Sequence, residues 1–411
     1  MRNRVWGLGV LAGVAAAALA GAVPAASASA SASAPGSLRP PPVTVLTDKT
    51  GTGGGDFFIS PFGDASTYAN GAEILSPDGK KVIWFHPASA GQEIADFRKQ
   101  TYEGKPVLTF WQGTGLGGVS TGADYIYGSD YKKIATVQAG NGYSADGHEF
   151  LITPWNTALV LSYTTATANL TSIGGPANQT VIDGIVQEID IRTGQVLFQW
   201  RSADHVPYSQ SEQPLPASAS TPWDWFHVNA VKLDTDGNLL VDARDTWTTY
   251  KVSRHTGQIL WQLGGQASSF TEQAAPGQVL NSAGKIFAWQ HDPEPLGHGV
   301  YTFFDNESAG TANTGSGTTT ELPYSRVVTV RLNARIHQAT LLRSVNQPEL
   351  LSAPSQGDGQ TLRDGGLLAG WGSLPYFSQF SPSGTLLFNA ELPTGVNTYR
   401  AYRFDWNPGR R

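Results

Sequence analysis

The sequence predicts an all-β protein, a single β-propeller that most simply has six blades of four antiparallel strands. Three observations support this fold class. Apolar residues alternate or run in short strings between Gly, Asp, Asn and Pro, which is the pattern of strands and turns. One strand–turn–strand phrase recurs along the chain. Residues 227–265 hold two such hairpins in tandem, and repeated four-stranded units are typical of propellers.

The N-terminal segment has the features of a secretory signal peptide. Arg2 and Arg4 precede an apolar stretch, and small residues at 26–28 offer a cleavage site. We expect residues 1–28 to be removed, residues 29–42 to form a Ser-, Ala- and Pro-rich tether, and residues 43–411 to form the propeller. The protein would then be secreted, without an integral membrane segment. The alternative is an uncleaved anchor, for which the apolar run is short.

The repeated phrase places a glycine in a turn between two strands rich in β-branched and aromatic residues. It occurs at residues 74–85, 188–200 and 250–261, with looser copies at 232–241 and 380–389. Gly suits these turns because it adopts positive φ without strain. At roughly 40 to 50 residues per blade plus loops, the chain suits six blades. Seven blades or a pair of β-sandwiches are the alternatives.

Amphipathic helices are almost absent from the pattern. Residues 94–100 are the one segment that we expect to be able to form a helical turn or two, because their apolar side chains do not alternate regularly.

The composition excludes several classes of function. The net charge is -6 and no run of Lys or Arg occurs, which argues against nucleic-acid binding. The chain has no Cys, so disulfides, zinc–thiolate sites, iron–sulfur clusters and a catalytic thiol are all excluded. Hydrophobic residues make up 40%, which is ample for a packed core.

Three of the eight histidines stand in dense, unusual contexts. His148, His227 and His291 each adjoin acidic and aromatic residues, and each lies where a loop enters an apolar strand. Residues at strand entrances of a propeller can line one mouth of its central channel, so blades far apart in sequence can bring these side chains together. The alternative is that the three are structural corners whose rings bind carboxylates.

Arg244 is expected beside His227. The turn at residues 236–238 folds two strands together, and this pairing returns Arg244 to the start of the strand that follows His227.

Three histidines and an arginine around one channel suggest an anion site. The guanidinium fork suits the oxygens of sulfate, phosphate or carboxylate. A neutral histidine can attack sulfur or phosphorus, while neighbouring groups donate to oxygens or protonate the leaving group. Three histidines could instead bind a metal such as Zn²⁺ with an open position for water, although Arg244 weakens that interpretation.

Several segments together resemble the bacterial arylsulfotransferase family, in the shorter form found in exported actinobacterial and fungal proteins. They are residues 224–229, 237–244, 250–265, 290–292, 304–306 and 399–402. The resemblance implies a six-bladed propeller that moves a sulfuryl group from an aryl sulfate donor to a phenolic acceptor. It implies no nucleotide donor, and we see no Walker-type loop for one. The N-terminal β-sandwich domain and cysteine pair of the enteric members are not matched here.

The resemblance also implies roles for particular residues. His291 matches the family's nucleophile, His227 and Arg244 its sulfuryl-binding pair, and His148 a fourth member by context. No cofactor and no metal are implied. We expect five further residues beside this set to bind substrate, the aromatic ones by stacking on its aryl groups, namely Trp225, Phe226, Asn229, Trp289 and Asp292. Blade packing is the alternative role for the aromatic ones.

Two other functions stay open at this point. The same histidines could serve a metal-dependent hydrolase or lyase, or the propeller could bind an extracellular ligand without catalysis. A quinone-dependent dehydrogenase is a weaker alternative, because nothing beyond the repeated Trp-containing phrases suggests its cofactor.

Overall fold

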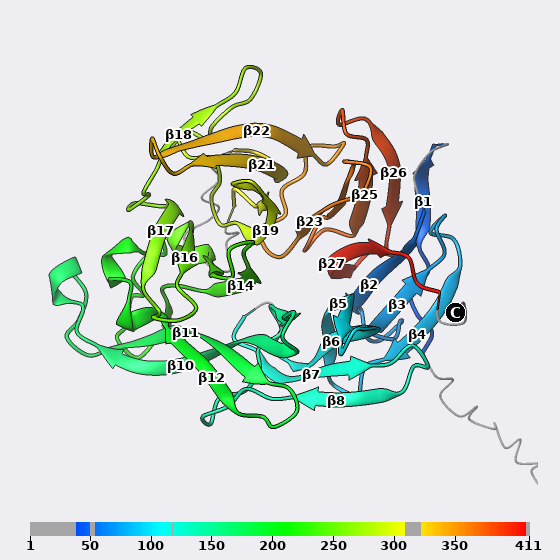
Figure 1. The fold of residues 1–411 in the computed structure, drawn as a ribbon, viewed down its shortest axis with the longest axis horizontal. Coiled ribbons are helices and arrows are strands. Elements are labelled where there is room, and N and C mark those ends of the chain that lie inside the picture. Colours follow the sequence, from blue (N-terminus) through cyan, green and yellow to red (C-terminus); the bar gives the residue numbers. More distant parts are fainter. Residues whose placement is uncertain (1–37, 50–53, 117, 309–321, 408–411) are drawn as a thin grey trace, which may run out of the picture. The chain divides into compact units, whose positions relative to one another are not determined.

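The computed structural model describes residues 38–49, 54–116, 118–308 and 322–407, and these form a ring of six antiparallel sheets. The prediction of a six-bladed propeller is therefore confirmed (Figure 1). The predicted signal peptide and most of the predicted tether lie outside the described residues. The described part of the chain contains no helix long and apolar enough to cross a membrane.

The strands of the first three blades follow one another along the chain from the channel outward. The first blade also takes in β27, and β13 adds to the third. These strands are β2 (Asp56–Gly63), β3 (Gly71–Leu75), β4 (Val82–Pro87), β5 (Glu93–Tyr102), β6 (Lys105–Thr114), β7 (Thr121–Tyr127), β8 (Lys133–Val137), β9 (Phe150–Ile152), β10 (Thr157–Ala168), β11 (Gln179–Asp190), β12 (Val196–Arg201) and β13 (Trp223–Asp224).

The last three blades have the same plan, with β18 and β1 as additional outer strands. Their strands are β14 (Val228–Leu233), β15 (Leu239–Ala243), β16 (Thr248–Val252), β17 (Ile259–Gly264), β18 (Thr271–Ala274), β19 (His291–Gly297), β20 (Val300–Asp305), β21 (Arg326–Asn333), β22 (Gln338–Asn346), β23 (Asp358–Thr361), β24 (Leu367–Gly370), β25 (Tyr376–Phe380) and β26 (Leu386–Glu391). Four short 3₁₀ turns complete the elements: η1 (Thr171–Ile173), η2 (Ser202–Asp204), η3 (Tyr208–Gln210) and η4 (Arg244–Thr246).

Two strands each join a blade built by the opposite end of the chain. The C-terminal strand β27 (Val396–Phe404) is the innermost strand of the first blade and pairs with β2. The N-terminal strand β1 (Thr44–Asp48) pairs with β26 on the outer edge of the last blade. β27 thus supplies the fourth strand of the first blade and closes the ring, whereas β1 adds a fifth strand to the outer edge of the last blade.

The recurring phrase forms a hairpin at each predicted position. Residues 74–85 give the β3–β4 hairpin, 188–200 give β11–β12 and 250–261 give β16–β17. The looser copies form β14–β15 and β25–β26. Gly237, in the turn between β14 and β15, has a φ of 80°, which explains why glycine is needed there.

The prediction of helical turns at residues 94–100 is wrong, because the segment belongs to β5. Its pairing with β6 shifts between Ala95 and Arg98, and Asp96 has a φ of 50°. This β-bulge turns consecutive side chains inward, so Ile94, Ala95 and Phe97 are all buried. Three apolar residues at irregular spacing then imitate a helical period.

The core lies between neighbouring blades. Trp200 of the third blade packs near Phe226, with ring centroids 5.9 Å apart, and Phe226 stacks on Tyr250 of the fourth at 5.5 Å. Every residue of β15 and β16 is buried. Rigid packing of this kind fixes where the inner strand of each blade begins, and the candidate site lies there.

Candidate active site

The six inner strands, β27, β5, β9, β14, β19 and β23, form the wall of the central channel. His148 stands two residues before β9, His227 immediately before β14, and His291 is the first residue of β19. The rings of His148 and His227 lie with centroids 5.1 Å apart. Three separate blades thus bring these side chains to one mouth of the channel.

Each of the three rings is held through its Nδ1 atom. His148 Nδ1 lies 2.5 Å from Asp146 Oδ1, His227 Nδ1 lies 2.6 Å from Asp224 Oδ2, and His291 Nδ1 lies 2.8 Å from Asn306 Oδ1. A histidine anchored at Nδ1 presents Nε2 for chemistry.

The carboxylates anchoring the first two rings are themselves held. The Ser120 N–H and hydroxyl donate to Asp146 Oδ2 at 2.9 and 2.6 Å. Burial raises the pKa of Asp146, but the charge of His148 and these hydrogen bonds outweigh burial, and the pKa is lowered. Burial lowers the pKa of His227, but the Asp224 carboxylate outweighs burial, so the net pKa is raised. His227 is thereby suited to carry a proton.

His291 has the opposite electrostatic setting. It is 1% exposed, and burial together with the positive charges of Arg244 and His148 lowers its pKa well below the usual value. The backbone N–H of Gln356 donates to its Nε2 at 3.2 Å. A neutral imidazole with a lone pair on Nε2 is the form that can act as a nucleophile.

Arg244 lies beside His227, as the hairpin predicts. Its backbone N–H donates to the His227 carbonyl at 3.0 Å, which continues the pairing of β14 with β15. The guanidinium donates to Asp245 Oδ1 at 2.7 Å and to the Pro354 carbonyl at 3.0 Å, and it lies 5.1 Å from the ring centroid of Trp289. A buried guanidinium next to three imidazoles makes this mouth attractive to an anion.

Several residues around this mouth have a strained backbone. His227, Trp247, Trp289 and Asp292 all have φ between 50° and 58°, in the left-handed region that side chains other than Gly rarely adopt. Such conformations cost about 1–3 kcal/mol each and gather at functional sites. Residues in turns away from this mouth, such as Asn141, Asn156 and His337, have the same conformation, so strain alone does not mark the site.

The predicted aromatic residues divide into two groups. Trp225 and Phe226 are fully buried between blades, and the Trp225 indole N–H donates to Asp183 Oδ1 at 2.9 Å. Both residues therefore pack between blades, which is the alternative role that the sequence indicated for the aromatic residues. Trp289 instead lies against Arg244, and its ring meets that of Trp247 edge-on with centroids 5.3 Å apart.

Asn229 and Asp292 lie deeper along the same inner strands. The Asn229 amide donates to the Gln290 carbonyl at 2.7 Å, so it braces the backbone next to His291. The Asp292 carboxylate lies 2.7 Å from Lys232 Nζ and 3.4 Å from Arg400. Asp292 thus belongs to an ion network inside the channel.

This network, the charge layer, crosses the middle of the channel and was not predicted. Its members are the buried side chains of Asp96, Arg98, Glu149, Lys232, Asp292 and Arg400, with the partly exposed Glu294 on one side. Burial raises the pKa of Glu149, but Arg400, Lys232 and Arg98 outweigh burial and lower the pKa to about 2. Opposite charges from five blades therefore neutralise one another below the histidines.

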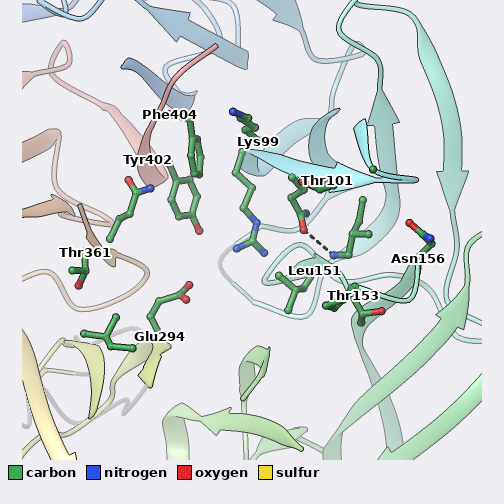
Figure 2. Close-up of a pocket in the computed structure, with 16 residues that line it drawn as sticks. Lys99, Thr101, Leu151, Thr153, Asn156, Glu294, Thr361, Tyr402 and Phe404 are labelled. Carbon is green, nitrogen blue, oxygen red and sulfur yellow. Dashed lines mark hydrogen bonds between the residues drawn. The ribbon is translucent and has the colours of Figure 1, made fainter. Parts of the chain in front are cut away.

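A cavity of about 690 Å³ lies at the other mouth of the channel, where the inner strands end. Figure 2 shows Tyr402, Phe404, Glu294 and Leu151 around it. None of the residues that line it is a histidine. The charge layer separates this cavity from the mouth that holds His148, His227 and His291.

One group at the histidine mouth has a spacing suited to a metal ion. Ligand atoms of Asp224, His227 and Asp245 lie within 4.8 Å of one another. However, the Arg244 guanidinium already bonds Asp245, and His227 uses Nδ1 for Asp224. A divalent cation would have to displace both contacts.

Four further residues shape the site without having been predicted for it. Asp146 and Asp224 could have been found, because each lies two or three residues before a candidate histidine. Asn306 and Gln356 come from other elements, 15 and 65 residues from His291. Asn306 follows β20, whose pairing with β19 places Phe304 opposite His291, whereas Gln356 comes from the segment before β23 of the next blade, which only the closed ring brings to His291.

The fold and this mouth define a six-bladed propeller with a histidine–arginine site suited to a small anion. Residues 98–392, more than half of the chain, match the family described as Arylsulfotransferase (ASST). The chain therefore belongs to the arylsulfotransferase family, as the sequence predicted. The family suggests aryl sulfotransferase activity and implies small-molecule substrates.

Solved structures show only distant likeness. A protein of unknown function from Bacteroides caccae is 13% identical, with a TM-score of 0.47, over 85% of this chain and 98% of its own. A protein from Lactobacillus plantarum is 12% identical, with a TM-score of 0.41, over 85% and 99%. A catalytically inactive virginiamycin B lyase from Staphylococcus aureus is 8% identical, with a TM-score of 0.38, over 87% and 88%. These values support no inference about activity. No curated protein matches the chain.

Proposed function

We propose that this protein transfers a sulfuryl group from an aryl sulfate to a phenolic acceptor through a sulfated His291, without a nucleotide donor. The observation that carries the proposal is the pairing of a neutral, buried His291 with a cationic surround. Its Nε2 holds a lone pair, while Arg244 and His227 supply positive charge and donors at the same mouth.

In the first half of the reaction, the His291 Nε2 lone pair attacks sulfur, and the bond between sulfur and the aryl oxygen breaks. The electron pair leaves with the phenolate, which takes a proton from His227. Arg244 balances the charge on the sulfuryl oxygens. Sulfuryl transfer, like phosphoryl transfer, has a loose in-line transition state, so positioning and charge stabilisation dominate.

In the second half, the oxygen of the acceptor phenol attacks sulfur. The bond between sulfur and nitrogen breaks, its electron pair returns to His291 Nε2, and the phenolic proton passes to His227. The Gln356 N–H donates to His291 Nε2 at 3.2 Å before substrate binds, so it must leave the lone pair as sulfur approaches, and it can then donate to a sulfuryl oxygen. The enzyme ends in its starting protonation state.

The test is donor turnover by purified protein lacking the predicted signal peptide. We expect release of nitrophenol from 4-nitrophenyl sulfate that rises with added phenol, survives a chelator and disappears in His291→Ala. His255, exposed in the β16–β17 turn, provides the control variant His255→Ala, which should retain full activity. Mass analysis of a rapidly quenched reaction should find a sulfuryl adduct on the peptide that contains His291. Undiminished turnover in His291→Ala would refute the assignment.

A metal-dependent hydrolase is the second candidate, and the grouping of Asp224, His227 and Asp245 favours it. It predicts turnover that a chelator abolishes and Zn²⁺ or Mn²⁺ restores, with no dependence on phenol. The contact between Arg244 and Asp245 favours the sulfotransferase, because it compensates the carboxylate that a metal would need.

We also propose that the protein acts outside the cell. The support is the N-terminal sequence, in which two arginines, an apolar stretch and a small-residue cleavage site follow in order. Expression of the full-length chain should place the protein in the culture medium, with its N-terminus close to residue 29. Retention of the intact chain inside the cell would contradict this.

A further inference from the structure

The three histidines at the mouth differ in what holds their Nδ1 atoms. His148 and His227 are held by carboxylates, those of Asp146 and Asp224, whereas His291 is held by the amide oxygen of Asn306. A carboxylate stabilises an imidazolium ring by its charge, whereas an amide oxygen accepts the same hydrogen bond without a charge. The ring assigned to attack sulfur is therefore the one with an uncharged partner.

The orientation of the Asn306 amide is fixed by its other end. Its Nδ2 donates to the Ala353 carbonyl at 2.7 Å and to the Gln356 carbonyl at 3.0 Å. Rotating the amide by half a turn would set Oδ1 against two carbonyl oxygens, so Oδ1 must face His291. The proton of the neutral ring then lies on Nδ1.

A second hydrogen bond requires the same tautomer. The Gln356 N–H donates to His291 Nε2, and a nitrogen that accepts cannot carry the proton. The segment between β22 and β23 thus contributes three contacts, two to Asn306 and one to His291. All of them leave the lone pair on Nε2.

The charged groups around His291 act in the same direction. Arg244, His148 and His227 are the charged groups whose fields reach it, and each disfavours a further positive charge. Asp305 and Glu307 flank Asn306 in sequence, but they face the buried Arg326, whose Nε lies 2.8 Å from Asp305 Oδ2.

We propose that Asn306 is the positioning residue of this site, holding His291 in the Nδ1–H tautomer, and that the contrast between amide and carboxylate partners separates the nucleophile from the proton-donating His227. This inference rests on the proposed function. It adds a physical reason why histidines at the same mouth have different roles in the reaction, namely the charge of the group that holds each Nδ1.

The proposal is tested by exchanging amide and carboxylate at position 306, which holds His291, and at position 224, which holds His227. Asn306→Asp keeps the shape of the side chain and adds a charge, so it should favour the imidazolium form of His291. We expect the acid limb of the pH profile of 4-nitrophenyl sulfate turnover to move at least one unit toward alkaline pH, with about a tenfold loss of turnover on the acid side of that limb. The matched control, Asp224→Asn, removes a charge from His227. It should lower turnover and move the titration of His291 much less than Asn306→Asp does, because it reaches His291 only through the charge of His227.

Ring-nitrogen NMR of protein labelled with ¹⁵N-histidine reads the tautomer directly, and the signals missing from His291→Gln assign the resonances. In the unmodified protein, His291 should be neutral at pH 7 with its proton on Nδ1. A proton on Nε2, or an imidazolium at that pH, would overturn the proposal even if Asn306→Asp fails to fold. An unchanged His291 titration and pH profile in a folded Asn306→Asp would also overturn it.

The two claims fail separately. If no aryl sulfate is turned over at any pH, the proposed function fails, while the NMR measurement still decides how His291 is held. If turnover passes through His291 but the ring carries its proton on Nε2, the function stands and the role of Asn306 falls.

Discussion

The histidine mouth and the charge layer are built on the same inner strands, yet they treat charge in opposite ways. In the charge layer, every buried cation has carboxylate partners from other blades, and Lys232 and Arg400 each contact three of them. At the mouth, His291 is kept neutral and faces Arg244 and two further histidines. A few residues along the strand therefore separate a network of paired charges from a site built around a neutral imidazole.

The difference indicates what each layer contributes. In a network of buried ion pairs the charges are already compensated by one another, and removing one partner leaves a buried charge without that compensation. At the mouth, Arg244 and His227 also contact carboxylates, those of Asp245 and Asp224, but His291 is a neutral ring that no carboxylate anchors. An aryl sulfate would meet a lone pair there rather than a closed ion pair. Substitutions in the charge layer should thus act on stability, and substitutions at the mouth should act on turnover.

Breaking the charge layer should give the largest effect. Lys232→Met leaves Glu149, Asp292 and Glu294 without their shared cation, and we expect a loss of about 3–5 kcal/mol in unfolding free energy at pH 7. Urea denaturation measures it. The loss should shrink as the pH falls toward 4, because the uncompensated carboxylates then take up protons in the folded state.

The control for this substitution is Lys132→Met. Lys132 forms an ion pair with Asp130 at 3.7 Å, but both side chains are largely exposed, so no measurable change in stability is expected. Equal effects of the two substitutions would mean that the charge layer is not the strongly coupled network inferred here.

Arg244→Lys tests the other side of the comparison. The substitution keeps the positive charge but loses the planar fork, and we expect kcat/KM for 4-nitrophenyl sulfate to fall about 10²–10³-fold. Arg254→Lys is the matched control, because Arg254 makes a similar fork with Glu188 away from the mouth. If Arg244→Lys keeps activity within about threefold of the unmodified protein, a point charge is sufficient to bind the sulfuryl oxygens and the planar fork is not needed.

The sequence was sufficient to predict the fold because its signal is local. A hairpin with Gly237 in the turn, or with Gly257, is visible within a dozen residues. The error at residues 94–100 has the same origin, because a bulge at Asp96 breaks the alternation on which strand prediction depends. The pairing of β1 with β26 and of β27 with β2 joins the two ends of the chain, and no local pattern announces it.

The candidate site was predictable to the extent that its motifs are continuous. His227 and Arg244 belong to one hairpin, so turn geometry alone brings them together. Lys232 and Arg400 are each an isolated charged residue within a strand, and such residues are usually predicted to face solvent. Their burial depends on charges from other blades, so only the assembled channel reveals it.

Two buried tryptophans test the same distinction between stability and turnover, with the smallest expected effects. Trp225→Phe removes an indole N–H that donates to Asp183 between blades. We expect a stability loss of about 1–2 kcal/mol, with KM unchanged within about twofold. Trp289→Phe removes part of the ring that faces Arg244, and we expect kcat/KM to fall about 3- to 10-fold with little change in stability.

These outcomes depend on placement, because both tryptophans are almost fully buried and both were predicted to bind substrate. Denaturation curves and kinetics on the same preparations measure the two effects independently. A raised KM in Trp225→Phe would show that the third and fourth blades separate enough to admit an aryl ring. The residues that bind substrate would then extend further from the channel than Arg244 and Trp289.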